Sequence, residues 1–506
     1  DLAARSRSLT AFYTDAGVLP RRALFASYGE TFSLHAISGE PWAVGLLFGL
    51  AAAIAIALLV GYRTRLAVVG SWLLLLSLLA RNPMVLNSGD SLLLALLFWS
   101  VFLPLGSRWS IDAVRRATGR DDAESNTDDM RGQGTGTPTA GPAGAAVASV
   151  ATMAVLIQML LMYLTNAVHK VESEFWMGGE AVAYIMQADQ FTYLLGNQLA
   201  EFSGLLRALT FLWVALLFAS PLLLLLTGYP RAVLASLFVG MHLGMQVTMR
   251  IGLFPLIVVV GFLLFFQTPV WELGARVVDR LNWSRALREW RSRFESLAGI
   301  VNTAEASLLR PIGASANRLG ARRESDHSAG LARGRLLFST VLPYVFLVLI
   351  LLSSAGAAGY ADVPEPAENV LDTVEMDQSW RMFAPDPART TRWFVAAGTL
   401  EDGTERDVLQ DSAVTFDRPA RVETATRSAR WRKYLKNVYD VDNEDHRSYL
   451  ANYLCAEWNR THETDVESVT VTHLYERTNP YNGTVEAEGN FTVIEYDCSG
   501  PFVQNE

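Results

Sequence analysis

The first two thirds of the chain consist of long apolar runs separated by short polar connections. Most runs approach the roughly 20 residues that an α-helix needs to cross the hydrocarbon core of a bilayer. The eight predicted spans are 43–61, 66–86, 91–105, 146–166, 208–227, 231–249, 251–268 and 336–353. Residues 1–42 are mixed in hydropathy and contain several aromatic residues and prolines, which indicates interfacial helix and loop. The pattern therefore predicts an α-helical polytopic membrane domain over residues 1–353.

The pattern changes near Ser354, where short alternating segments replace the apolar runs. Residues 391–400 and 405–409 flank Glu401-Asp-Gly-Thr404, which is typical of a β-hairpin. Further strands are predicted at 469–475 and 489–496, and helices at 427–438 and 447–458. Residues 354–506 are therefore predicted to form a small, largely β domain with one or two helices.

Two connections within the membrane domain are unusual. Residues 121–144 are rich first in Asp, Ser and Thr and then in Gly, Pro and Thr, so they predict a flexible linker with nothing to bury. Residues 271–325 carry arginines at helical spacing among Trp271, Trp283 and Trp290, which suggests amphipathic helices on the inner leaflet. A simply solvated helix would show the same pattern.

Charge divides the chain at the same boundary. Residues 354–506 hold 28 acidic and 14 basic residues, whereas the first 353 hold 23 acidic and 28 basic. The acidic domain argues against nucleic-acid binding. Acidity with little lysine is typical of proteins that work in high salt, as in a halophilic archaeon, although GC-rich codon usage would also favour arginine. We expect a membrane domain followed by a water-soluble one.

The basic residues also predict an orientation. If the connections 62–65, 106–145, 228–230 and 269–335 share one side, with Arg231 at its boundary, that side carries 20 Lys and Arg. The opposite connections, without residues 1–42, carry four: Arg81, Lys170, Arg207 and Arg250. The positive-inside rule then places the basic loops in the cytoplasm and the C-terminal domain outside the cell. The four arginines of residues 1–42 also fall outside, against the trend.

An extracellular C-terminal domain changes the meaning of several of its residues. Cys455 and Cys498 could form a disulfide there, or could remain two free thiols. Asn459, Asn482 and Asn490 each begin an Asn-x-Ser/Thr sequence that could be glycosylated. Such sequences also arise by chance, because Asn282 begins one on the predicted inner side.

Lysine is used sparingly, at 3 positions against 39 arginines, and only Lys170 belongs to the membrane domain. Arginine does not lose its proton in proteins, whereas a desolvated lysine can. The use of lysine here therefore indicates a candidate base at this position. The alternative is a lysine at a helix end whose amine reaches the membrane interface.

Polar groups at membrane depth are candidate functional residues. Besides His169-Lys170, they comprise the Asn87-Ser-Gly-Asp90 turn, His242, and Arg207. All lie in the predicted outer half, so we expect them to converge on one outward pocket. Asp90 could instead cap a helix, and His169 and His242 could be axial haem ligands. No dinucleotide, phosphate-loop, zinc or nucleophile-elbow motif accompanies them.

Five segments in order resemble the horizontally transferred transmembrane (HTTM) family, which includes vitamin K-dependent γ-glutamyl carboxylase. They are Phe12-Tyr-Thr-Asp-Ala-Gly-Val-Leu-Pro-Arg21, Asn87-Ser-Gly-Asp90 with Phe98 and Pro104-Leu-Gly106, Val168-His-Lys170 before Trp176, His242 before Ile251-Gly-Leu-Phe254, and Ser379-Trp-Arg-Met382. The resemblance covers roughly residues 1–400. The family usually has one more transmembrane helix before the segment that matches Asp1-Leu2, so a missing in-to-out helix would explain the outer placement of residues 1–42.

The resemblance implies that a reduced naphthoquinone, vitamin K or menaquinol, reacts with O2 while a glutamate of a protein or peptide captures CO2, without a metal. Lys170 takes the position of the proposed base, in a Val-Lys-Lys context whose first lysine is His169 here. His242 matches a family histidine, and Asp90 stands where the carboxylase has a histidine thought to assist catalysis. The implied quinone contacts are Asn87, Trp176, Met245, Gln246 and Arg250.

Asp90 departs from the family pattern, because a carboxylate near Lys170 would favour the charged amine or orient its neighbours. A good ion pair of Lys170 with Glu172 or Glu174 would also oppose a basic role. Beyond about residue 400 the likeness fades, so quinol oxygenation is better supported than glutamate carboxylation. The alternative is a non-catalytic membrane protein for binding, transport or assembly on the same fold.

Overall fold

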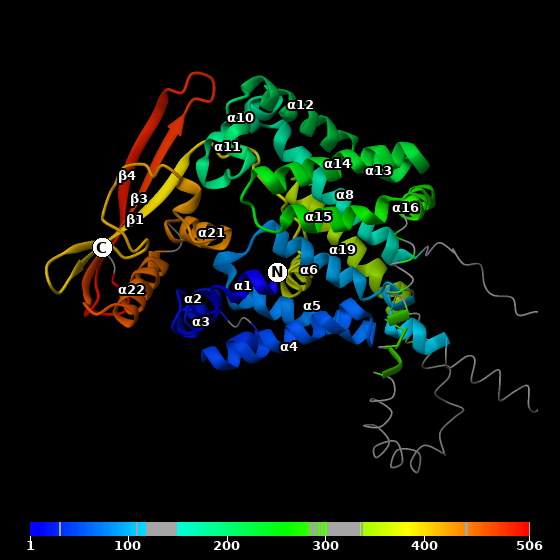
Figure 1. Cartoon of the computed structure of the whole chain (residues 1–506), viewed down its shortest axis with the longest axis horizontal. Helices are drawn as coiled ribbons and strands as arrows, with labels where there is room; N and C mark the ends of the chain where they lie inside the picture. Colours follow the sequence, from blue (N-terminus) through cyan, green and yellow to red (C-terminus); the bar gives the residue numbers. More distant parts are fainter. Residues whose placement is uncertain are drawn as a thin grey trace, which may run out of the picture.

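The computed structural model combines a body of helices with a small antiparallel sheet at one end (Figure 1). It describes residues 1–29, 32–107, 110–117, 149–281, 337–440 and 444–504, with scattered positions between 283 and 300 and residue 334. The predicted linker at 121–144 lies outside the described residues, as does much of the predicted amphipathic segment 271–325.

Four described helical stretches are long and apolar enough to cross a membrane: α4 (Pro41–Val60), α5 (Thr64–Arg81), α8 (Val150–Val171) and Leu337–Ala357, which ends in α19 (Leu342–Ala357). A fifth is Phe254–Phe265 with α16 (Thr268–Arg280), if that pair, bent by 106°, counts as one span. The chain is thus membrane-associated, but the structure does not confirm all eight predicted spans.

The remaining predicted spans differ from the expectation for local reasons. The run at 91–105 forms only the short helix α6 (Ser88–Ser100). The run at 208–227 divides at Pro221 into α12 (Ser203–Ala219) and α13 (Leu222–Leu225). The helix α14 (Gly228–Thr248) is long enough, but it is not among the described helices that are sufficiently apolar.

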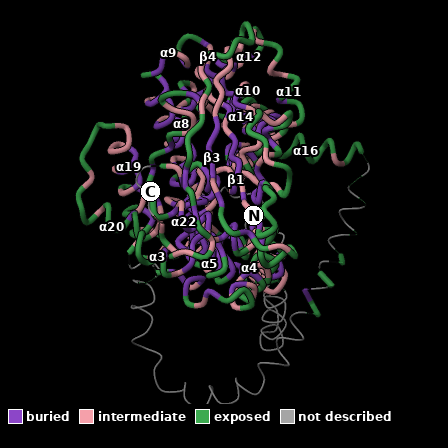
Figure 2. The backbone as a smooth tube through the Cα atoms, turned by 90° about the vertical axis from the view of Figure 1, so that its left-hand side faces the viewer, coloured by how far each residue is buried: buried purple, intermediate pink, exposed green. Residues whose placement is uncertain are grey.

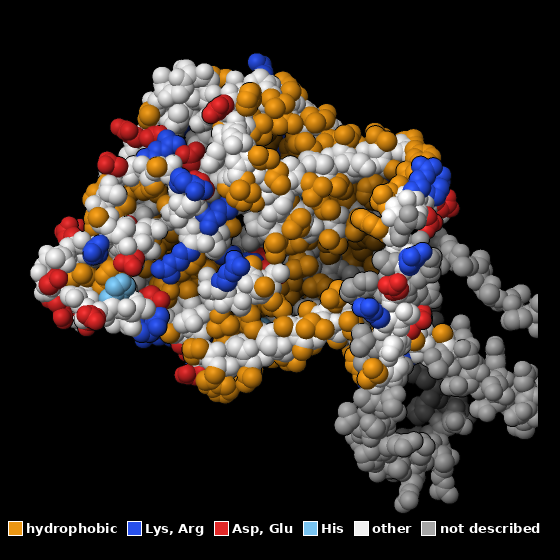
Figure 3. Space-filling view, viewed as in Figure 1, with side chains coloured by type: hydrophobic (Ala, Val, Ile, Leu, Met, Phe, Trp, Pro, Cys, Tyr) orange, Lys and Arg blue, Asp and Glu red, His pale blue; other side chains and the backbone are white. Residues whose placement is uncertain are grey.

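On the face shown in Figure 3, apolar side chains cover much of the helical body and charges gather at its two ends. The helix α4 is the clearest case, because Leu46, Ile56 and Leu59 all point outward and Leu59 is 82 % exposed. A contiguous apolar surface of this kind is unfavourable in water and is typical of lipid contact. The charged end at the sheet and the charged end at α16 therefore flank an apolar belt.

Several predicted basic loops meet at the end far from the sheet. The Asp112 carboxylate accepts hydrogen bonds from the backbone N–H groups of Arg63 and Thr64, which ties the α4–α5 turn to the loop after α6. Gly228 N–H likewise donates to Gln267 Oε1 at 2.5 Å, next to α16. Figure 1 shows α13 and α16 on this side, remote from the strands.

The C-terminal domain contains a four-stranded antiparallel sheet in the order β2-β1-β3-β4. Its strands are β1 (Thr391–Leu400), β2 (Glu405–Asp407), β3 (Val466–Thr478) and β4 (Val485–Asp497). Val395 pairs with Thr472, and Val471 pairs with Ile494. The predicted hairpin and both further strands are confirmed.

The two predicted helices of this domain are confirmed as α21 (Ala429–Val438) and α22 (Glu444–Thr461). The helix α22 packs on β3 and β4, and a disulfide joins its Cys455 to Cys498 directly after β4. Asn459, Asn482 and Asn490 are exposed. The disulfide forms as the first alternative predicted, and the three asparagines are accessible to modification.

The N-terminal segment shares its core with the C-terminal domain. It forms α1 (Leu2–Ser6), α2 (Leu9–Tyr13) and α3 (Arg21–Tyr28). Phe12 is buried with its ring centroid 4.8 Å from that of Trp431 in α21. Segments more than 400 positions apart thus form one hydrophobic cluster.

The remaining short helices include α9 (Glu174–Met177), α10 (Ala181–Gln187), α11 (Leu195–Leu199), α15 (Phe254–Phe262) and α20 (Glu365–Thr373). Figure 2 shows α16 and α20 as exposed elements at the periphery. The helix α8 instead buries one whole face, which includes Lys170 at its last turn.

Candidate functional site

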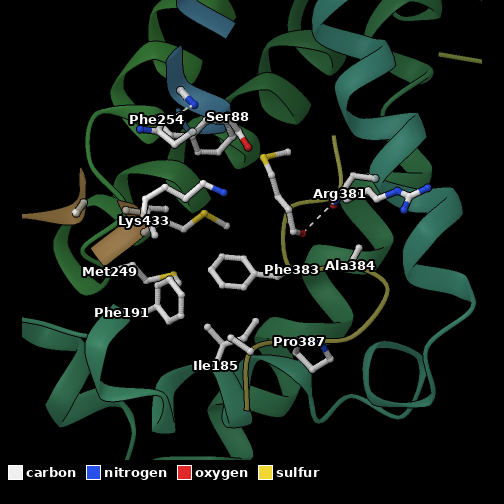
Figure 4. Close-up of a pocket in the computed structure, with 18 of the residues that line it drawn as sticks. Ser88, Ile185, Phe191, Met249, Phe254, Arg381, Phe383, Ala384, Pro387 and Lys433 are labelled. Carbon is white, nitrogen blue, oxygen red and sulfur yellow. Dashed lines mark hydrogen bonds between the residues drawn. The ribbon is translucent and has the colours of Figure 1, made fainter. Parts of the chain in front are cut away.

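A cavity of about 1040 Å³ lies where α8 and α14 meet the segment 375–390 and α21. This volume is at the upper end of ordinary small-molecule sites, which occupy about 300–1,000 Å³. Figure 4 shows Phe383 entering it from the segment 375–390, opposite Phe191 and Met249. The rings of Phe191 and Phe383 lie 5.3 Å apart. The cavity therefore has apolar, aromatic side chains in its interior, which suit an apolar ligand.

Lys170 lies in the cavity wall and is only 3 % exposed. Its Nζ donates to Asn166 Oδ1 at 2.7 Å and to the Met382 carbonyl at 3.0 Å. It also lies 3.9 Å from the ring centroid of Trp176. Each partner is uncharged, and no described ion pair includes Lys170. The amine is thus fixed in position without a carboxylate to hold its proton.

The ion pairs that would have opposed a basic role do not form. Glu172 and Glu174 follow Lys170 closely, but both are exposed to solvent and neither forms a described ion pair with it. The chain turns away after α8, and Trp176 rather than a carboxylate returns to cover the amine. Its indole Nε1 donates to the Phe383 carbonyl at 2.8 Å, which fixes the ring.

The segment 375–390 is fastened to α8 by a buried chain of amides. Gln158 Nε2 donates to Gln378 Oε1 at 2.6 Å, and Trp380 Nε1 donates to the same oxygen at 2.8 Å. About two turns further along α8, Asn166 Nδ2 donates to the Trp380 carbonyl at 3.0 Å. Gln158 Oε1 has no described partner, but the other buried hydrogen bonds join the two segments directly. Ser379-Trp-Arg-Met382 is thereby held over Lys170.

The same segment carries unusual backbone geometry. Glu375, Trp380 and Phe383 have φ values of 52°, 32° and 52°, a region that non-glycine residues rarely adopt. Each such residue costs about 1–3 kcal/mol and persists only where its surroundings determine it. Strain concentrated beside a cavity is typical of a functional segment.

His242 also lines the cavity and is almost fully buried. Its Nδ1 lies 2.8 Å from the Phe238 carbonyl, which can only accept, so Nδ1 carries the proton. Its Nε2 then faces the Tyr163 hydroxyl at 3.5 Å. The ring is packed between aromatic residues, 5.5 Å from Trp213. His242 therefore holds Nε2 beside the Tyr163 hydroxyl in the wall of the cavity.

Asp90 does not line the cavity among the described residues, although Asn87, Ser88 and Gly89 do. Its carboxylate accepts from Arg5 at 2.6 Å and from two nitrogens of Arg430 at 2.8 and 2.9 Å. It also accepts from the backbone N–H of Asn87 at 3.2 Å, within a capping box at the start of α6. The structure gives Asp90 a structural role as the acceptor in a buried ion cluster.

The other predicted site residues divide between the cavity and its supports. Trp176 and Met245 line the cavity, as does Asn87, whereas Gln246, His169 and Arg207 are not part of the described wall. Arg250 lies behind the wall, where it donates to the carbonyls of Glu423 and Thr426. Arg250 therefore connects the end of α14 to the C-terminal domain.

Sequence reasoning missed several cations of this wall, including the two other lysines of the chain. Lys433 and Lys436, both in α21, line the cavity from the C-terminal domain. With Lys170 they are the only lysines of the chain. The rarity of lysine, which drew attention to Lys170, was a signal for these two residues as well. They were missed because only Lys170 belongs to the predicted membrane domain, where candidate functional residues were sought.

Comparison with protein-family models, curated proteins and solved structures finds no match for this chain.

Proposed function

We propose that the protein is a multi-pass membrane enzyme that couples oxygenation of a reduced naphthoquinone, such as menaquinol, to carboxylation of glutamate. The observation that carries this proposal is Lys170, a buried lysine without a carboxylate partner among the described residues, in the wall of an apolar, aromatic cavity. The resemblance to the HTTM family gives the same residue the role of base.

The overall reaction balances with quinol, O2, glutamate and CO2 as reactants. Quinol and O2 give quinone epoxide and water, and the oxygenation supplies the strong base that removes the glutamate γ-proton. Carbon dioxide then adds to that carbon, so the glutamate gains one carboxyl group. The protein has to bind a flat apolar molecule, accept a proton from its hydroxyl, and exclude bulk water.

The residues of the wall fit these tasks. In its uncharged form Lys170 can accept a hydroxyl proton, and Asn166 Oδ1 and the Met382 carbonyl hold its nitrogen in place. In its neutral form, His242 would offer Nε2, beside the Tyr163 hydroxyl, as a second acceptor on another helix. Phe191, Met249 and Phe383 form the apolar interior that would contact the quinone ring.

The proposal includes a C-terminal domain outside the cell. The disulfide between Cys455 and Cys498 supports an oxidising compartment, and the exposed Asn459, Asn482 and Asn490 are compatible with glycosylation there. The joined basic loops at the end far from the sheet support a cytoplasmic location for that end.

The test replaces Lys170 in protein purified in detergent. Lys170→Arg keeps a cation but cannot supply a neutral amine, and Lys170→Gln removes the charge. We expect both variants to lose quinone-epoxide formation by about 100-fold or more, the usual contribution of a general base. Their thermal unfolding should remain close to that of the unmodified protein. Arg207→Gln, an exposed cation outside the described wall, is the matched control.

Labelled bicarbonate and a glutamate-containing peptide resolve the two half-reactions. Epoxide with fixed label supports the whole proposal, and epoxide without label limits it to quinol oxygenation. Lys170→Arg turnover within a few-fold of the unmodified protein would refute the assignment of the base.

A non-catalytic membrane protein for binding, transport or assembly is the second candidate. It is favoured by Asp90, which stands where the carboxylase has a histidine and whose oxygens are occupied by Arg5 and Arg430. Folded protein that produces no epoxide from quinol and O2 would support this candidate.

A further inference from the structure

All three lysines of the chain line the same cavity. Lys170 belongs to the membrane helix α8, whereas Lys433 and Lys436 belong to α21 of the C-terminal domain. Residues three positions apart lie on the same face of a helix, so the last two amines point in similar directions. The cavity therefore has a cationic part, formed by Lys433 and Lys436, that belongs to a different domain from Lys170.

Lys433 reaches into the cavity from α21, and its amine points into the space between Phe254 and Phe383 (Figure 4). Its stem is half-buried, and Lys436 one turn later is exposed. The two residues thus mark a path from solvent to the interior. An apolar floor with a cation above it suits a ligand with a short hydrocarbon stem and an anionic end.

Lys433 forms no salt bridge or hydrogen bond among the described residues, and the one nearby carboxylate that favours its charged form is that of Asp440. The neighbouring guanidinium groups are engaged, because Arg432 donates to the carbonyls of Gln190 and Arg250 at 2.8 and 2.7 Å, and Arg392 donates to the Tyr439 hydroxyl. Burial lowers the pKa of Lys433 below its usual range, and the nearby Lys436 acts in the same direction. An unpaired, partly desolvated cation is unfavourable, and a bound anion would relieve it.

We infer that Lys433 and Lys436 form a carboxylate-binding subsite that receives the acidic side chain of a peptide substrate. This inference rests on the proposed function, since it assigns the substrate end of the cavity that Lys170 serves. A peptide is favoured over a lipid headgroup because α21 belongs to the charged end of the molecule and not to the apolar belt (Figure 3).

The test measures equilibrium binding of a fluorescent peptide to the full chain in detergent. The peptide is neutral except for one glutamate, and its partner carries glutamine at that position. We expect the glutamate peptide to bind about tenfold more tightly, and Lys433→Gln to abolish the difference. Lys433→Arg should retain most of it because the charge remains. Arg406→Gln, an exposed cation of β2, makes the same charge change outside the described wall.

Equal loss of binding in Lys433→Gln and Arg406→Gln would overturn the inference, because the attraction would then be general. Unchanged discrimination in Lys433→Gln, in protein that melts normally, would overturn it as well. The proposed function is scored separately by epoxide formation without peptide. If binding is selective for glutamate and depends on Lys433, but the protein forms no epoxide, the subsite is supported and the quinol chemistry is refuted. If the protein forms epoxide and Lys433 has no effect on binding, the quinol chemistry is supported and the subsite is refuted.

Discussion

Asp90 is the residue whose replacement best separates a structural role from a chemical one. Its carboxylate accepts three hydrogen bonds from two guanidinium groups, at 2.6, 2.8 and 2.9 Å. The Arg5 side chain is fully buried and that of Arg430 is 14 % exposed. Asp90→Asn would leave these two cations facing an amide. The three hydrogen bonds join α1, α6 and α21, so their loss would weaken the contacts among all three helices.

The expected loss of stability follows from the number of hydrogen bonds that Asp90→Asn removes and from the interactions that remain. Hydrogen bonds to charged groups contribute about 1.5–3 kcal/mol each, so three could account for more than 4 kcal/mol. The carboxylate of Asp1 still contacts both guanidinium groups and asparagine still accepts one bond, which reduces the loss. We therefore expect Asp90→Asn to lower the free energy of unfolding by about 3–5 kcal/mol, as for other broken buried pairs.

The assay is thermal unfolding followed by tryptophan fluorescence in detergent, with quinol turnover normalised to folded protein. Glu405→Gln, an exposed carboxylate of β2, is the control and should change little. The double variant Asp90→Asn with Arg430→Gln should be less destabilised than the sum of the single variants, because one uncompensated charge is removed. Normal melting of Asp90→Asn together with a 100-fold loss of turnover would refute the structural assignment.

Two further predictions concern the C-terminal domain. His473 is buried, neither ring nitrogen has a described hydrogen-bond partner, and burial lowers its pKa to about 4. The unfolded chain therefore binds a proton that the folded chain does not between about pH 6.5 and 4, so stability falls as the pH falls through this window, by up to about 3 kcal/mol. His473→Phe should remove that part of the loss in melting curves across this pH range, and an unchanged pH slope would contradict it. The disulfide from Cys455 to Cys498 closes a separation of 43 residues, which corresponds to about 4 kcal/mol. Replacing both cysteines by alanine should lower the melting temperature of the domain, and reducing agent should then have no additional effect.

The sheet was predictable because its signals are local. Alternating segments and the Glu401-Asp-Gly-Thr404 turn are read directly from neighbouring residues, and the strands form as expected. The membrane spans were harder, because hydropathy does not report a break such as the one at Pro221. Apolar runs also form short helices inside the body, where other protein rather than lipid surrounds them.

The candidate site was predictable only where a single residue carried the signal. Lys170 and His242 stood out as polar groups in apolar runs, and both line the cavity. The role of Asp90 was hidden, because its partner Arg430 is 340 positions away. Partners at such separation are brought together only by the tertiary fold, so a single sequence does not reveal them.

The cluster that joins Phe12 to Trp431 has a consequence for biosynthesis. At ribosomal rates of about 5–20 residues per second, the about 420 residues between them take roughly 20–80 s to synthesise. During that interval the apolar face of α2 exists without its partner. The membrane surface or a chaperone must cover this face of the nascent chain until α21 has emerged from the ribosome.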